Sequence, residues 1–179
     1  EGFDPAFLKR HFHDARGNFY EGGFLREIDG ELEKEWGHGP DDRSDLAELI
    51  KACRHPKPEE RWPLVSQHLN VDQFLTFMAI EIMTCHWDGY CRNRNNYRVY
   101  FEPITKQAHF LPHGMDQMFG DTNVSIGERP GAFVCQTVLS NPEWETAYRR
   151  RIRELQTHFI PPDRLHKLVD DATARMLPV

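Results

Sequence analysis

The stretch that decides the fold is residues 71–120, which read VDQFLTFMAIEIMTCHWDGYCRNRNNYRVYFEPITKQAHFLPHGMDQMFG. Its first part, from Phe74 to Met83, is apolar nearly all round a helical projection, a pattern typical of a buried core helix. Asp72 supplies an N-cap acceptor for this helix, and we expect the helix to end near His86, before Gly89.

The second part of the stretch predicts a β-hairpin between two polar loops. Residues 87–95 show no periodicity and predict a loop. Apolar and polar residues then alternate over residues 97–101 and again around residues 109–111, with turn-forming residues between, which indicates two paired strands. Residues 112–131 predict a second loop. The expected order is therefore helix, polar loop, hairpin, polar loop.

Shorter elements precede this stretch. Asp4-Pro5 predicts a helix start with Phe7, Leu8 and Phe12 on its apolar side, and Ser44 predicts the N-cap of a second helix. A third helix, bent near Pro63, is expected over residues 59–69. Residues 18–21 suit a short strand, whereas residues 26–42, rich in Glu, Gly and Pro, predict a surface excursion.

Two helices are expected to close the chain. The first starts at Asn141-Pro142-Glu143, where an N-cap residue is followed by proline and an acidic residue. The second starts at Pro161-Pro162-Asp163. The apolar residues predicted to face inward are Trp144, Tyr148, Ile152, Leu155 and Phe159 on the first helix and Leu165, Leu168, Val169, Ala172 and Met176 on the second. The sequence thus predicts an α+β fold, a mostly helical lobe with a small β-hairpin, in a single domain over residues 1–179.

The composition excludes several functional classes. The 179 residues are 39% hydrophobic and 28% charged, as in globular domains, and the net charge of −6 provides no basic field for nucleic acid. The basic run Arg149, Arg150, Arg151 and Arg153 is interpreted as the solvated face of a helix. No apolar run approaches the roughly 20 residues that span a bilayer. Because the chain starts at Glu1 rather than Met, we expect it to be a processed or excised piece.

Four cysteines are present, Cys53, Cys85, Cys91 and Cys135, and no pair has CxxC spacing. Zinc-ribbon and thioredoxin-like interpretations are therefore weak. An even number permits two disulfides, but the spacing does not select a pairing.

One set of polar residues has the parts that phosphoryl transfer needs. A hairpin brings its two outer ends together, so Asn96, before the first strand, and Asp116, after the second, should be near neighbours. Asp88 lies eight residues before Asn96 in the same loop. Phosphoryl transfer requires hard oxygen ligands for magnesium and one carboxylate that orients the attacking hydroxyl, and two Asp and one Asn can supply them.

Other polar residues of these loops are secondary candidates. Arg92, Arg94 and Arg98 match the geometry of phosphate oxygens and are candidate phosphate- or nucleotide-binding residues, with solvated loop charge as the alternative. His86 and Trp87 are expected to orient the loop that carries Asp88. A zinc site built from His86, His109 and His113 with Cys85 or Asp116 is a weaker alternative, because no pair has the usual ligand spacing.

Three segments carry a resemblance to a known family. They are His86-Trp87-Asp88-Gly89-Tyr90, Asn95-Asn96-Tyr97-Arg98-Val99-Tyr100, and Phe110-Leu111-Pro112 through Asp116 to Phe119-Gly120. Together they resemble the spore-coat protein H (CotH) kinase family, whose pattern runs Trp-Asp, Asn-Tyr-x-x-Tyr, a hairpin, and Asp-x-Asp-x-x-Phe-Gly. The similarity extends from about Phe3 to Leu177, with Phe7-Leu8-Lys9-Arg10 and Gly17-Asn18-Phe19-Tyr20 upstream.

The resemblance implies a fold related to protein kinases and transfer of the ATP γ-phosphate to Ser or Thr of a protein substrate. It implies Mg²⁺ or Mn²⁺ as cofactor and slightly favours an extracytoplasmic or cell-surface location. Carried over to this chain, Asp88 would orient or deprotonate the acceptor hydroxyl, and Asn96 and Asp116 would hold the metal. Asn93 and Asn95 are rival ligands, and Asn96 is preferred because it directly precedes Tyr97.

Two departures from the family pattern keep an alternative open. Gly114 replaces the first Asp of Asp-x-Asp, and no Gly-rich loop or matching strand lysine is visible. We therefore expect the central and C-terminal part of a CotH-type domain without its N-terminal nucleotide-binding part. The leading alternative is a non-catalytic extracytoplasmic binding or structural module with an eroded active site. A metal-dependent hydrolase or another nucleotidyl transfer is a third hypothesis.

Overall fold

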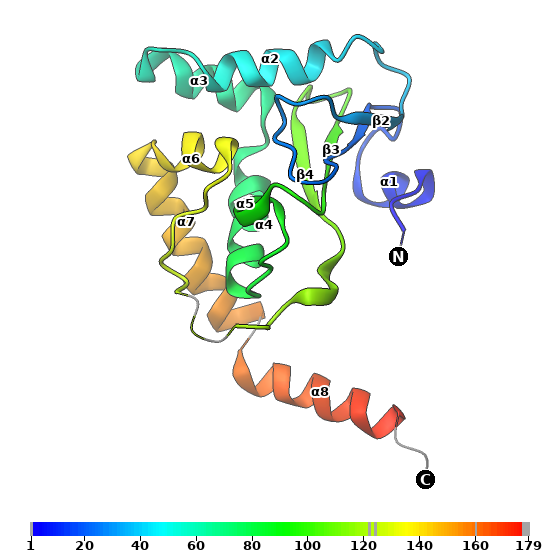
Figure 1. Ribbon diagram of the computed structural model, residues 1–179, viewed down its shortest axis with the longest axis vertical. Helices are drawn as coiled ribbons and strands as arrows, with labels where there is room; N and C mark the ends of the chain where they lie inside the picture. Colours follow the sequence, from blue (N-terminus) through cyan, green and yellow to red (C-terminus); the bar gives the residue numbers. More distant parts are fainter. Residues whose placement is uncertain (1, 122, 124, 160, 177–179) are drawn as a thin grey trace.

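The computed structural model describes residues 2–121, 123, 125–159 and 161–176 (Figure 1). The elements in chain order are α1 (Pro5–His11), β1 (Phe19–Glu21), β2 (Glu33–Trp36), α2 (Ser44–Cys53), α3 (Pro58–His68), α4 (Val71–Met83), α5 (Tyr90–Asn93), β3 (Tyr97–Phe101), β4 (Ala108–Pro112), the 3₁₀ turn η1 (Met115–Gln117), α6 (Phe133–Leu139), α7 (Pro142–Glu154), the π-helical turn η2 (Leu155–Phe159) and α8 (Pro162–Met176).

The sheet contains the predicted hairpin and two further strands. Its antiparallel order is β2-β1-β3-β4, with Tyr97 opposite Pro112 in the hairpin and Phe19 opposite Tyr100 between β1 and β3. The α+β prediction is confirmed, as is the short strand near residue 20. The chain therefore forms a four-stranded sheet where the hairpin and one short strand were expected.

The prediction of a surface excursion over residues 26–42 is wrong. This segment contains the edge strand β2, and both Ile28 and Leu32 have no exposed surface. The strand escaped prediction because its outward side carries Glu33 and Glu35, charges that suit an edge strand. Its half-buried Trp36 stacks on Phe19 with ring centroids 4.3 Å apart.

Helix α4 forms the core element that the sequence predicted, with seven buried residues. Its N-cap is Asn70, whose side chain accepts a hydrogen bond from the Gln73 N–H at 3.1 Å, so the assignment of the cap to Asp72 is wrong. The helix ends at Met83, earlier than expected, and one turn of helix, α5, begins inside the segment predicted as a loop. Gly89 starts this turn with extended backbone.

The two faces of the sheet pack against different partners. Tyr97, Val99 and Phe101 point to the main core with α4, whereas Tyr100 packs with Leu8 of α1 on the opposite face. The period-2 alternation of β3 therefore persists although every residue of the strand is buried. Because both faces of the sheet are covered, a shift of one residue would place each side chain of β3 on the wrong face, so the register of the hairpin is fixed.

The helices before α4 follow the sequence closely. Asp4 caps α1 by accepting the Phe7 N–H at 2.7 Å, as predicted. Ser44 is the first residue of α2 and not its cap; the preceding Arg43 has φ of 58°, and the Asp42 side chain accepts the Ser44 N–H. Pro63 lies inside α3, as expected.

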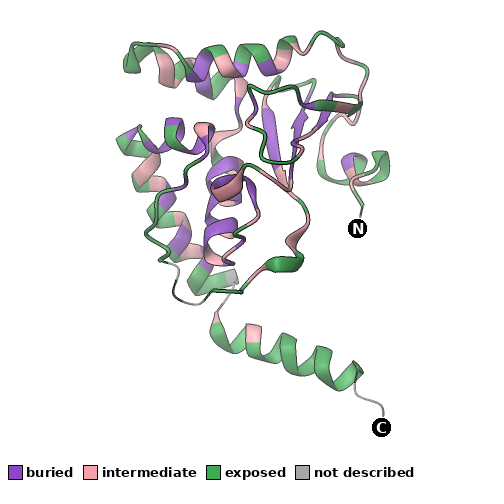
Figure 2. Cartoon of the chain, in the orientation of Figure 1, coloured by how far each residue is buried: buried purple, intermediate pink, exposed green. Residues whose placement is uncertain are grey.

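The C-terminal part shows one missed helix and one wrong burial prediction. Helix α6 was not predicted, and α7 is capped by Asn141 as expected, with Tyr148 and Ile152 buried. The side chain of Phe159 lies outside the described residues. Helix α8 forms where predicted but projects from the body, and none of its described residues is buried (Figures 1 and 2). Leu168, Val169 and Met176 are 56%, 63% and 76% exposed.

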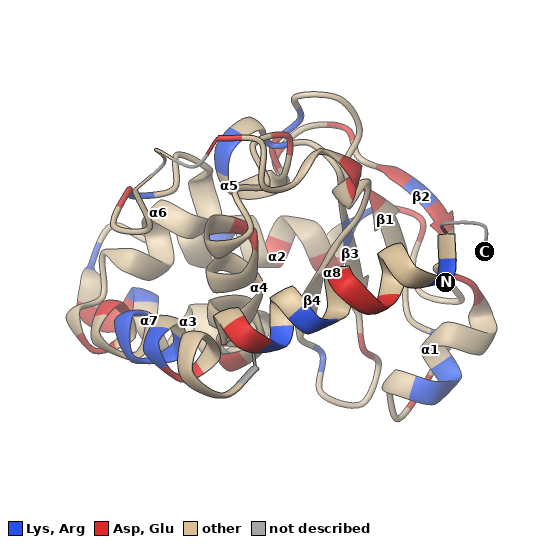
Figure 3. Cartoon of the chain, turned by 90° about the horizontal axis from the view of Figure 1, so that it is seen from below, with Lys and Arg blue, Asp and Glu red and all other residues tan. Residues whose placement is uncertain are grey.

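The basic run on α7 is interleaved with acidic groups (Figure 3). Arg149 pairs with Glu145 at 2.9 Å, and Arg151 pairs with Asp72 of α4 at 2.6 Å. Carboxylates therefore offset much of the positive charge on this helix. No helix within the described residues is both long and apolar enough to cross a bilayer.

Candidate functional site at the open end of the hairpin

Asp88 and Asn96 meet at the open end of the hairpin, where β3 begins and β4 ends. The Asn96 Nδ2 donates a hydrogen bond to Asp88 Oδ2 at 2.8 Å, and the Asn95 Nδ2 donates to Asp88 Oδ1 at 3.0 Å. Asp88 and both amides are half-buried. Both carboxylate oxygens are thus held in place, and neither Asn Oδ1 accepts a hydrogen bond from another described residue.

Gly114, in the segment after β4, lies against the Asn96 side chain. The His113 N–H donates to the Asn96 carbonyl at 2.8 Å, so the segment after β4 is fixed beside Asn96. A Cβ added at position 114 would lie 2.9 Å from Asn96 Cγ and Oδ1, and Gly114 has φ of +55°. Any residue with a side chain is therefore strained at this position unless Asn96 moves.

Asp116 lies on η1, two residues after Gly114, and its side chain is exposed. Its carboxylate makes no hydrogen bond or ion pair with Asp88 or Asn96 among the described residues. The structure therefore brings Asp88 and Asn96 together, with Asp116 on the adjoining turn.

A buried pair, Glu81 and His86, lies under the loop; the sequence indicated His86 as a loop-orienting residue but did not reveal Glu81 as functional. Glu81 lies on the core side of α4 with no exposed surface, where its two oxygens accept the N–H groups of Tyr90 and Cys91 at 3.3 Å and 2.9 Å. A Cβ on Gly89 would come within 2.6 Å of His86 Nδ1 and 2.8 Å of Glu81. Glu81 thus anchors the loop that carries Asp88. A buried acid in an otherwise apolar helix was the available signal.

His86 connects this anchor to the other side of the hairpin. Its Nε2 lies 3.3 Å from the Gly114 carbonyl, and its Nδ1 lies 3.6 Å from Glu81 Oε1, too far for a hydrogen bond. Burial acts to lower the pKa of His86, but the nearby Glu81 carboxylate and the Gly114 carbonyl outweigh it and raise the pKa above 6.5. The surroundings of His86 therefore favour its protonated form more than water does.

The three candidate arginines lie in different settings. Arg98 is almost fully buried and pairs with Glu21 at 2.9 Å and Glu35 at 3.4 Å. Arg92 is half-buried and pairs with Glu128 at 2.7 Å. Arg94 is exposed, with φ of 54° at the end of α5. Trp87, next to Asp88, is 45% exposed.

The residues of the zinc alternative are spread over several elements. His109 lies in β4 with its Nε2 4.0 Å from Glu102, and His113 is exposed beside Phe3. Within the ranges that the structure describes, no three or more His, Cys, Asp or Glu side chains are grouped to hold a metal ion.

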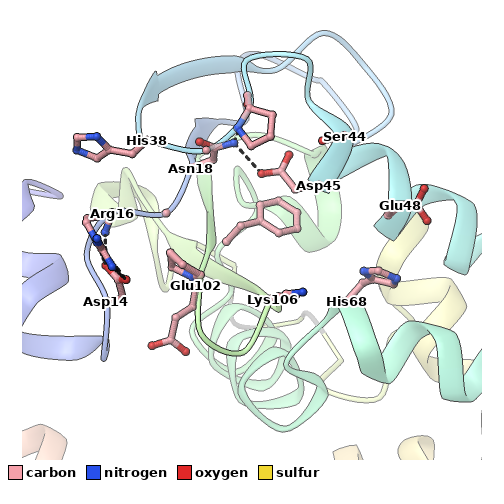
Figure 4. Close-up of a pocket in the computed structure, with 15 residues that line it drawn as sticks. Asp14, Arg16, Asn18, His38, Ser44, Asp45, Glu48, His68, Glu102 and Lys106 are labelled. Carbon is pink, nitrogen blue, oxygen red and sulfur yellow. Dashed lines mark hydrogen bonds and ion pairs between the residues drawn. The ribbon is translucent and has the colours of Figure 1, made fainter.

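A cavity of about 640 Å³ lies at the opposite, turn end of the hairpin (Figure 4). Phe101, Glu102 and Lys106 line it together with Asp45 and Glu48 of α2, and neither Asp88, Asn96 nor Asp116 contributes to its walls. Strands of five residues separate the two ends by about 15 Å. The cavity is therefore distinct from the Asp88–Asn96 site.

The fold and the site define a class of protein: a small α+β lobe in which an Asp–Asn pair at the open end of a hairpin adjoins a second Asp. The sequence profile of one family, CotH kinase protein, matches residues 1–178. The chain belongs to this CotH family.

Curated relatives with the same family name come from Rhizopus delemar. Invasin CotH7 is 26% identical over 111 residues, covering 51% of this chain and 18% of that protein. Invasin CotH2 is 37% identical over 60 residues, covering 33% and 10%, and Spore coat protein homolog 1 is 29% identical over 97 residues, covering 47% and 16%. The chain thus spans less than a fifth of the length of these relatives.

Proposed function

We propose that this chain carries the catalytic part of an ATP- and metal-dependent protein kinase of the CotH type. The observation that supports it most strongly is the fixed Asp88 carboxylate, held by the Asn95 and Asn96 amides at the open end of the hairpin. In this proposal Asp88 orients a Ser or Thr hydroxyl of a protein substrate and accepts its proton. Glu81 and His86 position the loop from below.

The residues present fit a hard divalent cation. Asn96 Oδ1 and the Asp116 carboxylate are oxygen ligands, and Mg²⁺ commonly uses one or two carboxylates together with substrate phosphates and water. Mg²⁺ or Mn²⁺ bound there would neutralise phosphate charge, and ATP would supply the phosphoryl group. Exposed Arg94 and the partly exposed Arg92 are the arginines best able to reach phosphate oxygens, since Arg98 is engaged within the sheet.

One observation favours the alternative of a non-catalytic module. The family pattern has an Asp where this chain has Gly114, and a side chain at that position would collide with Asn96. The second carboxylate of a paired metal site is therefore absent from this chain, and a side chain at position 114 would be strained and would require Asn96 to shift. A kinase of this type would have to work with the single carboxylate of Asp116.

The test is transfer of labelled phosphate from ATP to protein by the full-length protein, with Mg²⁺ or Mn²⁺. Asp116→Ala should abolish metal-dependent transfer, whereas Asp121→Ala, a matched exposed carboxylate in the same loop, should leave it unchanged. Absence of transfer from the wild type, together with absence of metal-dependent ATP binding, would favour the non-catalytic module.

A further inference from the structure

Two buried thiols lie against each other behind the candidate site. Cys91 Sγ and Cys135 Sγ are 3.7 Å apart, 44 residues apart in the chain, and neither residue has any exposed surface. Cys91 lies in α5 and Cys135 in α6. The other two cysteines, Cys53 and Cys85, make no sulfur–sulfur contact with a described residue at this distance.

The backbone on both sides of the sulfur pair is fixed. The Cys91 N–H donates to Glu81 at 2.9 Å, and the Cys91 carbonyl accepts the Gly131 N–H at 2.9 Å. At the start of α6, the Phe133 N–H donates to Glu27 at 2.7 Å. Because a disulfide has an S–S bond of about 2.05 Å, the sulfurs need to approach by about 1.7 Å to form one.

We propose that Cys91 and Cys135 form a structural disulfide that joins α5 to α6. The bond closes a loop of chain that contains Asn96, Gly114 and Asp116, and therefore both sides of the candidate site. Such a cross-link would stabilise the segment between β4 and α6, because every described residue from 119 to 129 is exposed and this stretch is held mainly at its ends. The inference does not depend on the chain being a kinase.

The bond forms by exchange with a small-molecule disulfide, such as oxidised glutathione. The thiolate of one cysteine attacks a sulfur of the small disulfide, giving a mixed disulfide and releasing one small thiol. The second cysteine thiolate then attacks the protein sulfur and releases the other small thiol. Two protein thiols are oxidised to the disulfide, the small disulfide is reduced, and the two S–H protons of the protein end on the two small thiols that leave.

Because Cys91 and Cys135 are buried in the folded protein, we expect the thiol–disulfide exchange to occur during folding. Burial raises the pKa of both thiols. The contact between the two sulfurs raises the pKa of Cys91 further and partly offsets the rise at Cys135. Thiolate is the attacking species, so exchange is slow once the thiols are enclosed. The disulfide is therefore expected to form while the chain folds and to resist reductants in the folded protein.

The experiment is refolding of the wild-type chain from denaturant in a glutathione redox buffer, followed by alkylation and peptide mapping under non-reducing conditions. We expect one cross-linked peptide pair containing Cys91 and Cys135, with Cys53 and Cys85 alkylated. The cross-linked form should melt on the order of 10 °C higher than the reduced form. Cys135→Ala should abolish this difference, and Cys85→Ala should preserve it.

Peptide mapping of the wild-type chain tests the Cys91–Cys135 disulfide even if a cysteine variant fails to fold. Alkylation of both Cys91 and Cys135 after oxidative refolding would overturn the proposal. Recovery of either cysteine in a cross-link to Cys53 or Cys85 would overturn it as well.

Discussion

The two ends of the β3–β4 hairpin are built in opposite ways. At the turn end a cavity of about 640 Å³ opens between side chains that include several charged ones, of which Asp14 and Arg16 pair with each other at 2.6 Å. At the open end Asp88, Asn96 and Gly114 are packed together, and buried Glu81 anchors the loop that carries Asp88. The proposed chemistry therefore rests on convergent, fixed polar groups and not on empty volume.

The largest effect should come from removing the carboxylate at the open end. Asp88→Asn keeps the shape of the side chain but removes the proton acceptor, so the rate of phosphate transfer should fall by about 10²–10⁴-fold. Glu48→Gln, at the rim of the cavity, is the matched change at the other end and should leave the rate within about twofold. Steady-state kinetics with labelled ATP measure both. Equal losses in the two variants would remove the functional distinction between the ends.

The close packing at the open end predicts that adding a single Cβ at Gly114 or Gly89 lowers the stability of the protein. Gly114→Ala places a Cβ 2.9 Å from the Asn96 side chain at φ of +55°, and Gly89→Ala places one 2.6 Å from His86. Each should lower the free energy of unfolding by about 1–3 kcal/mol. Gly120→Ala, where no atom lies within 4 Å of the added Cβ, is the control and should change it by less than about 0.5 kcal/mol. Urea unfolding of the three variants provides the comparison.

Two histidines predict opposite pH dependences of stability. His86 faces Glu81, Asp88 and the Gly114 carbonyl, and its pKa is raised above 6.5, so the stability it contributes is present below pH 6.5 and lost as the pH rises through its folded pKa. His109 faces Glu102 and Phe12, and burial lowers its pKa, so stability is lost as the pH falls below 6.5 towards its folded pKa.

Urea unfolding between about pH 5 and 8 separates these effects. His86→Gln should flatten the decline on the alkaline side, by at most about 1.4 kcal/mol per pH unit, and His109→Gln should flatten the decline on the acid side. Glu81→Gln should also flatten the alkaline decline, because the carboxylate is the group that raises the pKa of His86. An unchanged alkaline limb in His86→Gln would refute the coupling to Glu81.

The smallest effect concerns the arginines. Arg94→Ala should raise the KM for ATP by roughly three- to tenfold without changing stability, because the side chain is exposed and is proposed to bind phosphate. Arg98→Ala should instead lower stability, because it leaves Glu21 and Glu35 on the sheet without their cation. A changed KM in Arg98→Ala with unchanged melting temperature would reverse this assignment.

The sequence predicted the elements whose signals are local. Strand alternation in residues 97–101, the Asn141 cap and the apolar α4 are all determined by short-range patterns, and the structure has them. Helix α8 shows that such local patterns do not predict burial. Its apolar periodicity predicted a helix and its face, but burial also requires a neighbouring element, and within the described residues Leu168 and Val169 have none that covers them.

Only part of the geometry of the candidate site was predictable from the sequence. Antiparallel pairing places Asn96 beside the segment after β4, and the structure has that contact through the His113 N–H. The role of Glu81 was hidden, because its bonds go to backbone N–H groups nine and ten residues away and no sequence spacing records them. The collision that excludes a side chain at Gly114 likewise depends on the three-dimensional position of Asn96.

The most direct test of the account is to locate metal-bound nucleotide on the hairpin by paramagnetic broadening of ¹⁵N-labelled amide resonances, with Mn²⁺ and a non-hydrolysable ATP analogue. The account predicts that broadening is centred on Asp88, Asn96 and Asp116 and spares the turn residues Phe101, Glu102 and Lys106. Broadening centred on the turn residues, or none at saturating Mn²⁺ and nucleotide, would contradict it.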